Sequence, residues 1–372
     1  MNPMMPRPAR PLRFPTGSNP FPGIAALERS LGAPITARLS ANEALPLHSQ
    51  GLAARYGEAL LEQARRYPDP AAFELREALA AHHGLPVGAT LVDAGADALI
   101  FLFLRAFADP GSVVIHAAGT YPTVAYFARS LGLRPYSVSY AVTEGGAQVD
   151  LASLAIEAKR QRARVVYLAN PDNPTGSEHG AAAIKAFAAT LPAGTLLILD
   201  EAYEAFGKEH CAAPLPNVVR LRSFSKAYGL AGMRVGYAIA EPALLEVANR
   251  ARVHYGVGTV AQSLALAALH DQAHHRSVIA ATEELKGWFF EQAATKGLCS
   301  LPSAANFVAV RLPDRQAGED LQAHLLAQGA SLYLGALNGH IHLARVSLQP
   351  ELVNPMLADI LFRFQGRCHD RP

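Results

Sequence analysis

Two charged residues stand where apolar strands of the sequence are expected to end. Asp200 closes the run LLILD, so a strand carries one carboxylate to a largely dry place, where it needs a cationic or hydrogen-bonding partner. Lys226 lies in the glycine-rich segment SFSKAYGLAGMRVGY, and a lysine there could form a Schiff base if burial and a neighbouring charge lowered its pKa. Taken singly, Asp200 could equally be a loop or cap carboxylate and Lys226 a surface lysine.

A second set of residues could hold an anion. Gly95-Ala96-Asp97 follows the expected strand TLVDAG and opens a helix, so its backbone N–H groups could bind a phosphate, although an ordinary βα loop looks the same. Ser223 and Arg234, on either side of Lys226, supply hydroxyl and guanidinium donors of the kind that bind phosphate. Pyridoxal 5′-phosphate (PLP) needs a partner for its pyridinium nitrogen, a Schiff-base lysine and a phosphate site, and this combination therefore indicates PLP.

These residues need a sheet to position them, and the middle of the chain predicts one. Short apolar runs alternate with segments of helical length, which is typical of an α/β fold with a mainly parallel central sheet flanked by helices. The expected strands are ATLVDAG, SVVIHAAG, RVVYLANP, TLLILDEA, VVRLRSFS and GYAIA. Several are continuously apolar, so the sheet is expected to be covered on both faces. A ligand crevice lies beyond the carboxyl ends of such strands, where Tyr121, Asn173 and Tyr203 also fall.

The chain is expected to form two domains after a flexible leader. Residues 61–270 form the predicted large PLP-binding domain, and residues 1–25, rich in Pro and Arg, form the leader. Residues 26–60 and 271–372 are predicted to build a smaller α+β domain. Its expected strands NFVAVRLP and IHLARVSL are separated by the amphipathic helix GEDLQAHLLAQG and followed by the helix PELVNPMLADILFRF.

Composition excludes several classes of function. The chain has 372 residues, 50% of them hydrophobic, and its 33 Lys and Arg nearly balance 31 Asp and Glu, without a basic stripe for nucleic acid or a membrane. Cys211, Cys299 and Cys368 are odd in number and lack a CxxC pair, which disfavours a disulfide framework or structural zinc and fits a reducing cytoplasm. His340 and His342 share a strand face but lack a third ligand, so no metal site is predicted.

Three motifs give the chain a resemblance to a known family. The motifs NPDNPTG, LDEAYEAFG and SFSKAYGLAGMRVGY, in this order and spacing, resemble the fold type I PLP-dependent aminotransferases of class I/II. RYPDPAAFELREAL and LPSAANFVAV resemble the histidinol-phosphate aminotransferase branch, and the resemblance runs from about Leu39 to Leu361. It implies the PLP-transferase fold and transfer of an amino group between an amino acid, or an amino alcohol phosphate, and a 2-oxo acid.

The resemblance also implies roles around the cofactor ring. Lys226 would form the Schiff base and carry the proton, and Asp200 would pair with the pyridinium nitrogen. Asn173 and Tyr203 would hydrogen-bond the phenolic oxygen, and Tyr121 would stack on the ring. The resemblance thus implies that Lys226, Asp200 and Tyr203 are catalytic.

The phosphate is implied to bind to groups from both subunits. Its donors within one chain would be the backbone of Ala96 and Asp97 and the side chains of Ser223, Ser225 and Arg234. Tyr67, in RYPDP, would reach the phosphate of the other subunit. The resemblance therefore implies a homodimer with shared active sites.

The substrate side of the site departs from the family pattern. Arg345, in LARVSL, would hold the substrate carboxylate, and ANEALPLHSQ keeps Asn42 and Glu43 of the family's NENPxG but not its Pro and Gly. The loop that closes over the substrate is therefore expected to differ. Tyr333 stands where members that use phosphorylated substrates often have a basic residue. An uncharged side chain cannot replace charge-assisted contacts with a phosphate, which disfavours histidinol phosphate as the substrate.

Three other functions fit parts of the pattern. A PLP-dependent decarboxylase or cyclase would use the same Lys226 and Asp200, and the sequence does not separate these reactions. A PLP-sensing regulator would need an added DNA-binding module, and none precedes the aminotransferase-like region. A nucleotide-binding enzyme without PLP is disfavoured because no GxGxxG joins a strand to a helix.

Overall fold

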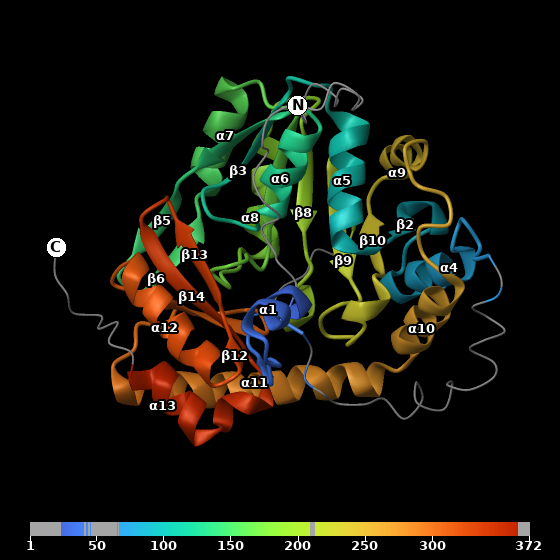
Figure 1. The fold of residues 1–372 in the computed structure, drawn as a ribbon. Coiled ribbons are helices and arrows are strands. Elements are labelled where there is room, and N and C mark those ends of the chain that lie inside the picture. The colour runs from blue at the N-terminus through green and yellow to red at the C-terminus, as the bar shows by residue number, and fades with distance from the viewer. Residues whose placement is uncertain are drawn as a thin grey trace, which may run out of the picture.

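The computed structural model describes residues 24–40, 42, 43, 45, 65, 67–208 and 213–363. Most of the predicted leader, residues 46–60 of the predicted N-terminal segment, residues 61–64 of the predicted large domain, and Cys211 and Cys368 lie outside the described residues. Figure 1 shows a large sheet with helices on both sides and a smaller sheet beside it. The boundaries between the two predicted domains stay a prediction.

A seven-stranded sheet forms the centre of the larger unit, in the order β2-β10-β9-β8-β7-β3-β4. Strand β10 runs antiparallel to both neighbours, whereas β9, β8, β7, β3 and β4 pair in parallel. The predicted mainly parallel sheet is confirmed. The strands are β2 (Thr90–Asp93), β3 (Val113–Ala117), β4 (Arg134–Val138), β7 (Val165–Ala169), β8 (Leu196–Asp200), β9 (Val218–Ser223) and β10 (Gly236–Ile239).

Helices cover both faces of this sheet, as the continuously apolar strands predict. Ile198 of β8 packs in the core beneath α5, α6 and α9, while its neighbours Leu197 and Leu199 pack on the opposite face beneath α7 and α8. Helices α4 and α10 cover the end of the sheet around β2 and β10. These helices are α4 (Phe73–His83), α5 (Gly95–Phe107), α6 (Thr123–Ser130), α7 (Leu151–Arg160), α8 (Ala181–Thr190), α9 (Pro242–Asn249) and α10 (Thr259–His270).

The smaller sheet is antiparallel, in the order β11-β14-β13. Its strands are β11 (Phe307–Arg311), β13 (Tyr333–Leu337) and β14 (Ile341–Ser347), and its helices are α11 (Gln272–Lys296), α12 (Arg315–Ala327) and α13 (Pro355–Arg363). Val308 and Val346 pack against these helices, whereas Ala309 and Leu343 share a core with the large sheet. Figure 1 shows α11 running beneath both sheets. The smaller sheet is therefore packed directly against the larger one.

The start of the described chain joins the C-terminal elements. After α1 (Ile24–Leu31), strand β1 (Ala37–Arg38) pairs in parallel with β12 (Ala330–Ser331). A hairpin of β5 (Tyr140–Thr143) and β6 (Gly146–Val149) and the short 3-10 helices η2 (Val87–Ala89), η3 (Glu204–Phe206), η4 (Ala231–Met233) and η5 (Pro350–Val353) complete the elements. None of the helices in the described part of the chain combines the length and the apolar character needed to cross a bilayer.

Candidate active site

A cavity of about 940 Å³ opens at the carboxyl ends of β7, β8 and β9. It brings together residues that lie as far apart in the sequence as Asn42 and Arg345. All the predicted site residues except Tyr67 line it: Asn42, Ala96, Asp97, Tyr121, Asn173, Asp200, Tyr203, Ser223, Ser225, Lys226, Arg234, Tyr333 and Arg345. The cavity therefore lies where the rule for open parallel sheets predicts a ligand crevice.

Asp200 is the last residue of β8, and its carboxylate is 6% exposed. The Tyr167 hydroxyl donates to its Oδ2 at 2.7 Å, and the Ala202 backbone N–H donates to its Oδ1 at 3.1 Å. Burial raises the pKa of Asp200 from its usual 3.8 to about 6, because these neutral donors offset only part of the lost hydration. A cationic partner would therefore stabilise the ionised form. Tyr167 was not predicted, and its only signal is a single phenol within the aliphatic strand VVYLA.

The loop after β7 presents Asn173 between two cis peptide bonds, Asn170–Pro171 and Asn173–Pro174. Asp172 is buried, and its carboxylate accepts hydrogen bonds from the hydroxyls of Thr120, Tyr140 and Thr175. Burial raises the pKa of Asp172, while these donors lower it. The loop is thus anchored through Asp172, and Asn173 faces the cavity.

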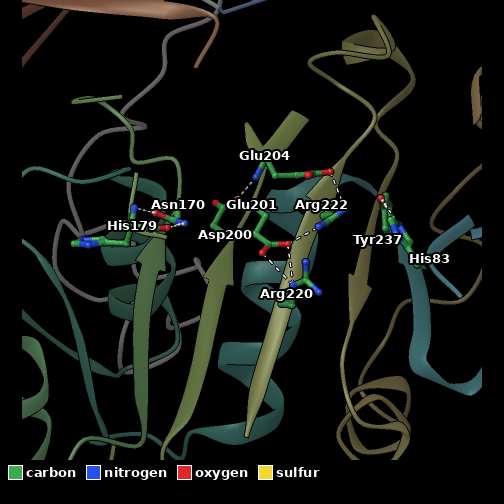
Figure 2. Close-up of polar contacts among 10 residues, drawn as sticks. His83, Asn170, His179, Asp200, Glu201, Glu204, Arg220, Arg222 and Tyr237 are labelled. Carbon is green, nitrogen blue, oxygen red and sulfur yellow. Dashed lines mark hydrogen bonds and ion pairs between the residues drawn. The ribbon is translucent and has the colours of Figure 1, made fainter. Parts of the chain in front are cut away.

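The other side of this loop is fixed by Asn170. Its side chain donates to the His179 carbonyl at 3.0 Å and accepts from the His179 N–H at 2.7 Å (Figure 2). Asn170 therefore closes the loop on itself and takes no part in the cavity wall. Both residues precede a proline, and the family motif assigns the contact with the ring to Asn173 alone.

Lys226 and Tyr203 lie side by side in the cavity wall. The Lys226 ammonium is 5.3 Å from the centre of the Tyr203 ring and donates to the Asn42 carbonyl at 3.1 Å. The Asn42 side chain donates to the Tyr203 hydroxyl at 3.0 Å, which leaves the hydroxyl proton of Tyr203 able to donate elsewhere. Asn42 therefore contacts two of the three predicted catalytic residues, Lys226 and Tyr203.

The predicted phosphate site lies where β2 turns into α5. Gly95 has a φ of +84°, and a Cβ there would lie 2.7 Å from Arg234 Nη2, so the close approach of this guanidinium requires glycine. Arg234 lies 3.4 Å from the Ser225 hydroxyl and 3.8 Å from Asp97. The hydroxyl of Tyr121 donates to Asp97 at 2.8 Å, which fixes its ring in the cavity wall. The arrangement supplies a helix N-terminus, a hydroxyl and a guanidinium for one anion.

Arg345, on β14, lies in the opposite wall and is 3% exposed. Its Nη1 donates to Asn173 Oδ1 and its Nη2 to the Ser40 carbonyl, both at 2.6 Å. Its Nε is buried and has no hydrogen-bond partner among the described residues. Burial lowers the pKa of Arg345, because both acceptors are neutral and do not compensate its charge. Among the described residues, the guanidinium therefore has no acidic partner, and it faces the cavity.

Comparisons with known proteins show which family the chain belongs to. The family model "Aminotransferase class I and II" matches residues 36–341. The chain is 34% identical to histidinol-phosphate aminotransferase 2 of Carboxydothermus hydrogenoformans over 77% of this chain and 80% of the relative. It is 36% identical to histidinol-phosphate aminotransferase of Anaeromyxobacter sp. over 82% of this chain and 84% of the relative.

A solved structure is similar over almost the whole chain. Histidinol-phosphate aminotransferase from Sinorhizobium meliloti, in complex with pyridoxal-5′-phosphate, superposes with a TM-score of 0.83 at 34% identity and covers 91% of this chain and 92% of its own. The chain belongs to the class I and II aminotransferases. It is a PLP-dependent aminotransferase of fold type I related to histidinol-phosphate aminotransferases, as the sequence motifs predict.

The cavity of this aminotransferase fits PLP at each part of the cofactor. Among the described residues Asp200 has no cationic partner, and the pyridinium nitrogen of PLP would supply one. The Tyr203 hydroxyl keeps a proton that it can donate to the phenolic oxygen of PLP. The site around Gly95 and Arg234 fits the phosphate, and Lys226 lies within the same cavity. The residues present therefore match the chemical groups of the cofactor.

A buried ion cluster lies directly behind Asp200 in the aminotransferase. Glu201 accepts from Arg220 at 3.0 Å and from Arg222 at 2.9 Å, and Arg222 also pairs with Glu204 at 2.7 Å (Figure 2). Arg220 is 1% exposed. These charges were not predicted as functional. The cluster ties the end of β8 to β9, the strand that leads to Lys226.

Tyr67 lies outside the cavity of its own chain. Its side chain is 87% exposed and its ring lies 5.2 Å from that of Tyr255. Within one subunit, Tyr67 therefore contributes nothing to the described site, and its implied role depends on a second subunit.

Proposed function

We propose that the cavity binds PLP through the residues that the family resemblance implies and that the enzyme moves an amino group from an amino donor to a 2-oxo acid. Bound PLP supplies an electron-withdrawing ring that weakens the bonds at the substrate's α-carbon. Asp200 pairs with the pyridinium nitrogen and keeps it protonated. Asn173 and Tyr203 bind the phenolic oxygen, and Tyr121 packs on the ring.

The phosphate is bound by the start of α5 and by the loop around Lys226. The proposed donors are the backbone N–H groups of Ala96 and Asp97, the hydroxyls of Ser223 and Ser225, and Arg234. Support comes from the approach of Arg234 to Ser225 and to the N-terminus of α5. Binding of a dianionic phosphate is favoured there because the N-terminus of α5 carries a positive partial charge and the Arg234 guanidinium carries a full one.

Lys226 is proposed to bind the cofactor covalently and then to move a proton to and from the substrate's α-carbon. The observation that carries the proposal is that one cavity holds the Lys226 amine, the Asp200 carboxylate and the Arg345 guanidinium. These supply, in turn, a general base, a partner for the ring nitrogen and a carboxylate receptor. Together with bound PLP, these three groups suffice to remove the amino group from one substrate and to add it to another.

Borohydride reduction followed by intact-protein mass spectrometry tests the lysine. The native enzyme should gain the mass of one reduced cofactor per chain, and Lys226→Ala should gain none. Lys185→Ala, an exposed lysine on α8, is the matched control and should label like the native enzyme. Labelling of Lys226→Ala to the native extent would contradict the assignment.

The transfer itself is tested by a half-reaction. Holoenzyme is incubated with a panel of amino donors without an acceptor, and the released cofactor is separated by chromatography. Conversion to pyridoxamine phosphate, with formation of the matching 2-oxo acid, is the expected result. Release of carbon dioxide without that conversion would instead indicate a decarboxylase.

We also propose that the enzyme is a homodimer whose subunits share their active sites. Support comes from an exposed apolar patch on the segments around residues 67–73 and 252–257, with Tyr67, Phe73, Val253 and Tyr255 all more than half exposed at 87%, 52%, 68% and 51%. A second copy of the chain would cover this patch. Tyr67→Asp should shift the enzyme towards monomer in light scattering and weaken PLP binding, whereas Ile156→Asp, on the exposed side of α7, should do neither. A dimer unaffected by Tyr67→Asp would contradict this interface.

A reducing cytoplasm is proposed as the working compartment. The three cysteines are odd in number and lack a CxxC pair, which accords with a chain that does not depend on disulfides. Fractionation of cells that express the native gene tests the location, and recovery of the enzyme outside the cytoplasm would contradict it.

A further inference from the structure

Part of the cavity wall is formed by residues outside the proposed cofactor site, and we call this part of the cavity the outer chamber. It is lined by Leu27, Ser30, Gln322, Ser331, Leu332, Tyr333 and Leu334, which come from α1, α12, β12, β13 and the residue between these two strands. These seven side chains are uncharged, and the charged residues nearest to them in the sheet pairing and the cavity wall, Arg38 and Glu43, form an ion pair with each other. The outer chamber adjoins Arg345, because Tyr333 and Arg345 face each other in the ladder between β13 and β14. A substrate whose carboxylate is bound by Arg345 would therefore place its side chain against these residues.

The basic residues that line the described cavity leave one uncompensated positive charge for the substrate. They are Arg38, Lys226, Arg234 and Arg345. Lys226 and Arg234 belong to the proposed cofactor site. Arg38 forms an ion pair with Glu43 at 3.1 Å, so its charge is already balanced. Arg345 alone combines burial with neutral acceptors on both terminal nitrogens.

Arg345 is also shaped to bind one planar anion. Its guanidinium carbon lies 4.4 Å from the centre of the Tyr333 ring and 5.3 Å from that of Phe307, so the fork is held by two aromatic side chains. Its Nε–H is unused among the described residues, and each terminal nitrogen has a further N–H. A carboxylate can accept two parallel hydrogen bonds from such a fork.

The Tyr333 ring contacts the Arg345 guanidinium, whose carbon lies 4.4 Å from the ring centre. On the same strand, a Cβ at Gly335 would lie 3.0 Å from Tyr333 Cε1, which is a tight contact, so glycine at this position leaves room for the ring. The ring forms a wall of the outer chamber beside the carboxylate receptor. An apolar or aromatic substrate side chain can pack on this wall, whereas a second anion would lose hydration there without gaining a cation.

We infer that the amino donor of this aminotransferase is an α-amino acid with an uncharged, largely apolar side chain, and that Tyr333 determines this specificity. Arg345 binds the α-carboxylate, and the outer chamber receives the side chain. The inference rests on the proposed function. It predicts that a donor with a phosphate on its side chain, or one that lacks the carboxylate, is used poorly.

The test compares donors with the holoenzyme and one fixed 2-oxo acid. L-leucine and L-phenylalanine represent apolar side chains, O-phospho-L-serine adds a side-chain phosphate, and L-histidinol phosphate lacks the carboxylate. We expect kcat/KM for the better apolar donor to exceed that of both phosphorylated donors by about tenfold or more, which is about 1.4 kcal/mol. An equal or higher kcat/KM for either phosphorylated donor overturns the inference but leaves the proposed function standing. If no donor converts bound PLP to pyridoxamine phosphate, the proposed function fails as well.

Two sets of variants test the residues. Tyr333→Ala should lower kcat/KM for L-phenylalanine about tenfold more than for L-alanine, whose side chain is too short to lie on the ring. An equal loss for both donors would mean that Tyr333 has only a structural role. Glu43→Gln should expose the charge of Arg38 and raise the ratio of kcat/KM for O-phospho-L-serine over L-leucine by up to about fivefold. The double variant Arg38→Ala/Glu43→Gln should remove that gain, and a gain that persists in it would overturn the charge argument.

Discussion

Tyr333 lies directly opposite Arg345 across the β13–β14 ladder, and its ring centre is 4.4 Å from the guanidinium carbon. One side chain thus supports the only cation of the described cavity wall that neither belongs to the proposed cofactor site nor forms an ion pair. Tyr333 on β13 is neutral and Arg345 on β14 is charged. We expect Tyr333 to contact the side chain of the substrate and Arg345 to bind its carboxylate. The binding of the substrate carboxylate by Arg345 leads to the first prediction.

Arg345→Gln should raise KM for amino acid donors by about 10- to 150-fold, because a charge-assisted hydrogen bond contributes about 1.5–3 kcal/mol. Arg345→Lys keeps the charge but loses the planar guanidinium. Its KM should therefore lie between that of the native enzyme and that of Arg345→Gln. Steady-state kinetics over a range of donor concentrations measure the effect. An unchanged KM in Arg345→Gln would show that the carboxylate binds elsewhere.

Asp200→Asn should stabilise the protein without cofactor at neutral pH. In the folded protein its pKa is about 6 against the usual 3.8, so the native state keeps this proton to higher pH than the unfolded chain does. Stability from this group is therefore highest below about pH 4 and falls as pH rises through 6, by about 3 kcal/mol in full. Thermal unfolding of the apoprotein should show a gain for Asp200→Asn at about pH 7.5 and little difference at about pH 4.

The same Asp200→Asn variant should bind PLP more weakly, because it no longer offers a carboxylate to the pyridinium nitrogen. Titration of apoprotein with PLP, followed by fluorescence, measures this second effect. A variant that is destabilised equally at both pH values would contradict the burial argument, while unchanged PLP affinity would contradict the pairing.

Tyr140→Phe should destabilise the loop that carries Asn173. The Tyr140 hydroxyl donates to both oxygens of the buried Asp172 carboxylate, at 3.0 and 3.2 Å, so its loss should cost about 1.5–3 kcal/mol of the free energy of unfolding. Tyr136→Phe is the matched control, since its hydroxyl hydrogen-bonds only to the exposed side chains of Arg160 and Glu157 among the described residues. Chemical denaturation compares the two variants. Equal stabilities would show that the Asp172 network does not need this donor.

Glu201→Gln should be among the most damaging single changes outside the cavity. It would leave the buried side chains of Arg220 and Arg222 short of a counterion, which costs about 3–5 kcal/mol of the free energy of unfolding. Glu157→Gln removes the partner of Arg160 in an exposed ion pair and should cause no measurable change in the unfolding midpoint. If both variants melt alike, the buried cluster does not stabilise the end of β8.

Much of the fold could be predicted because its central strands are runs of consecutive apolar residues, which are easy to recognise in the sequence. The runs VVYLA and LLILD are buried along their whole length as β7 and β8, as continuous apolar strands in a doubly covered sheet must be. Strand β4, Arg134–Val138, escaped prediction because an edge strand with exposed polar residues and a proline lacks that pattern. The antiparallel direction of β10 was also missed, since periodicity does not encode strand direction.

The residues of the predicted site line one cavity because most of them follow strands whose ends meet at one edge of the sheet, and their roles remain predictions. The sequence analysis missed groups whose contribution cannot be inferred from the residue type alone. Ser40 binds Arg345 through its main-chain carbonyl, and Phe307 contributes only a ring face. Tyr167 reaches Asp200 from a neighbouring strand, a contact that depends on the register between β7 and β8. Tyr67 was predicted to act in another subunit, and this remains a prediction.

The pairing of β1 with β12 joins residues 37–38 to residues 330–331. On a ribosome, every proposed PLP contact within one chain, from Ala96 to Arg234, emerges well before the partner of β1 exists. The proposed carboxylate receptor Arg345 and the tyrosine beside it follow later still in the sequence. Translation therefore makes the residues proposed to contact PLP before it makes Tyr333 and Arg345, the two residues proposed to select the amino acid.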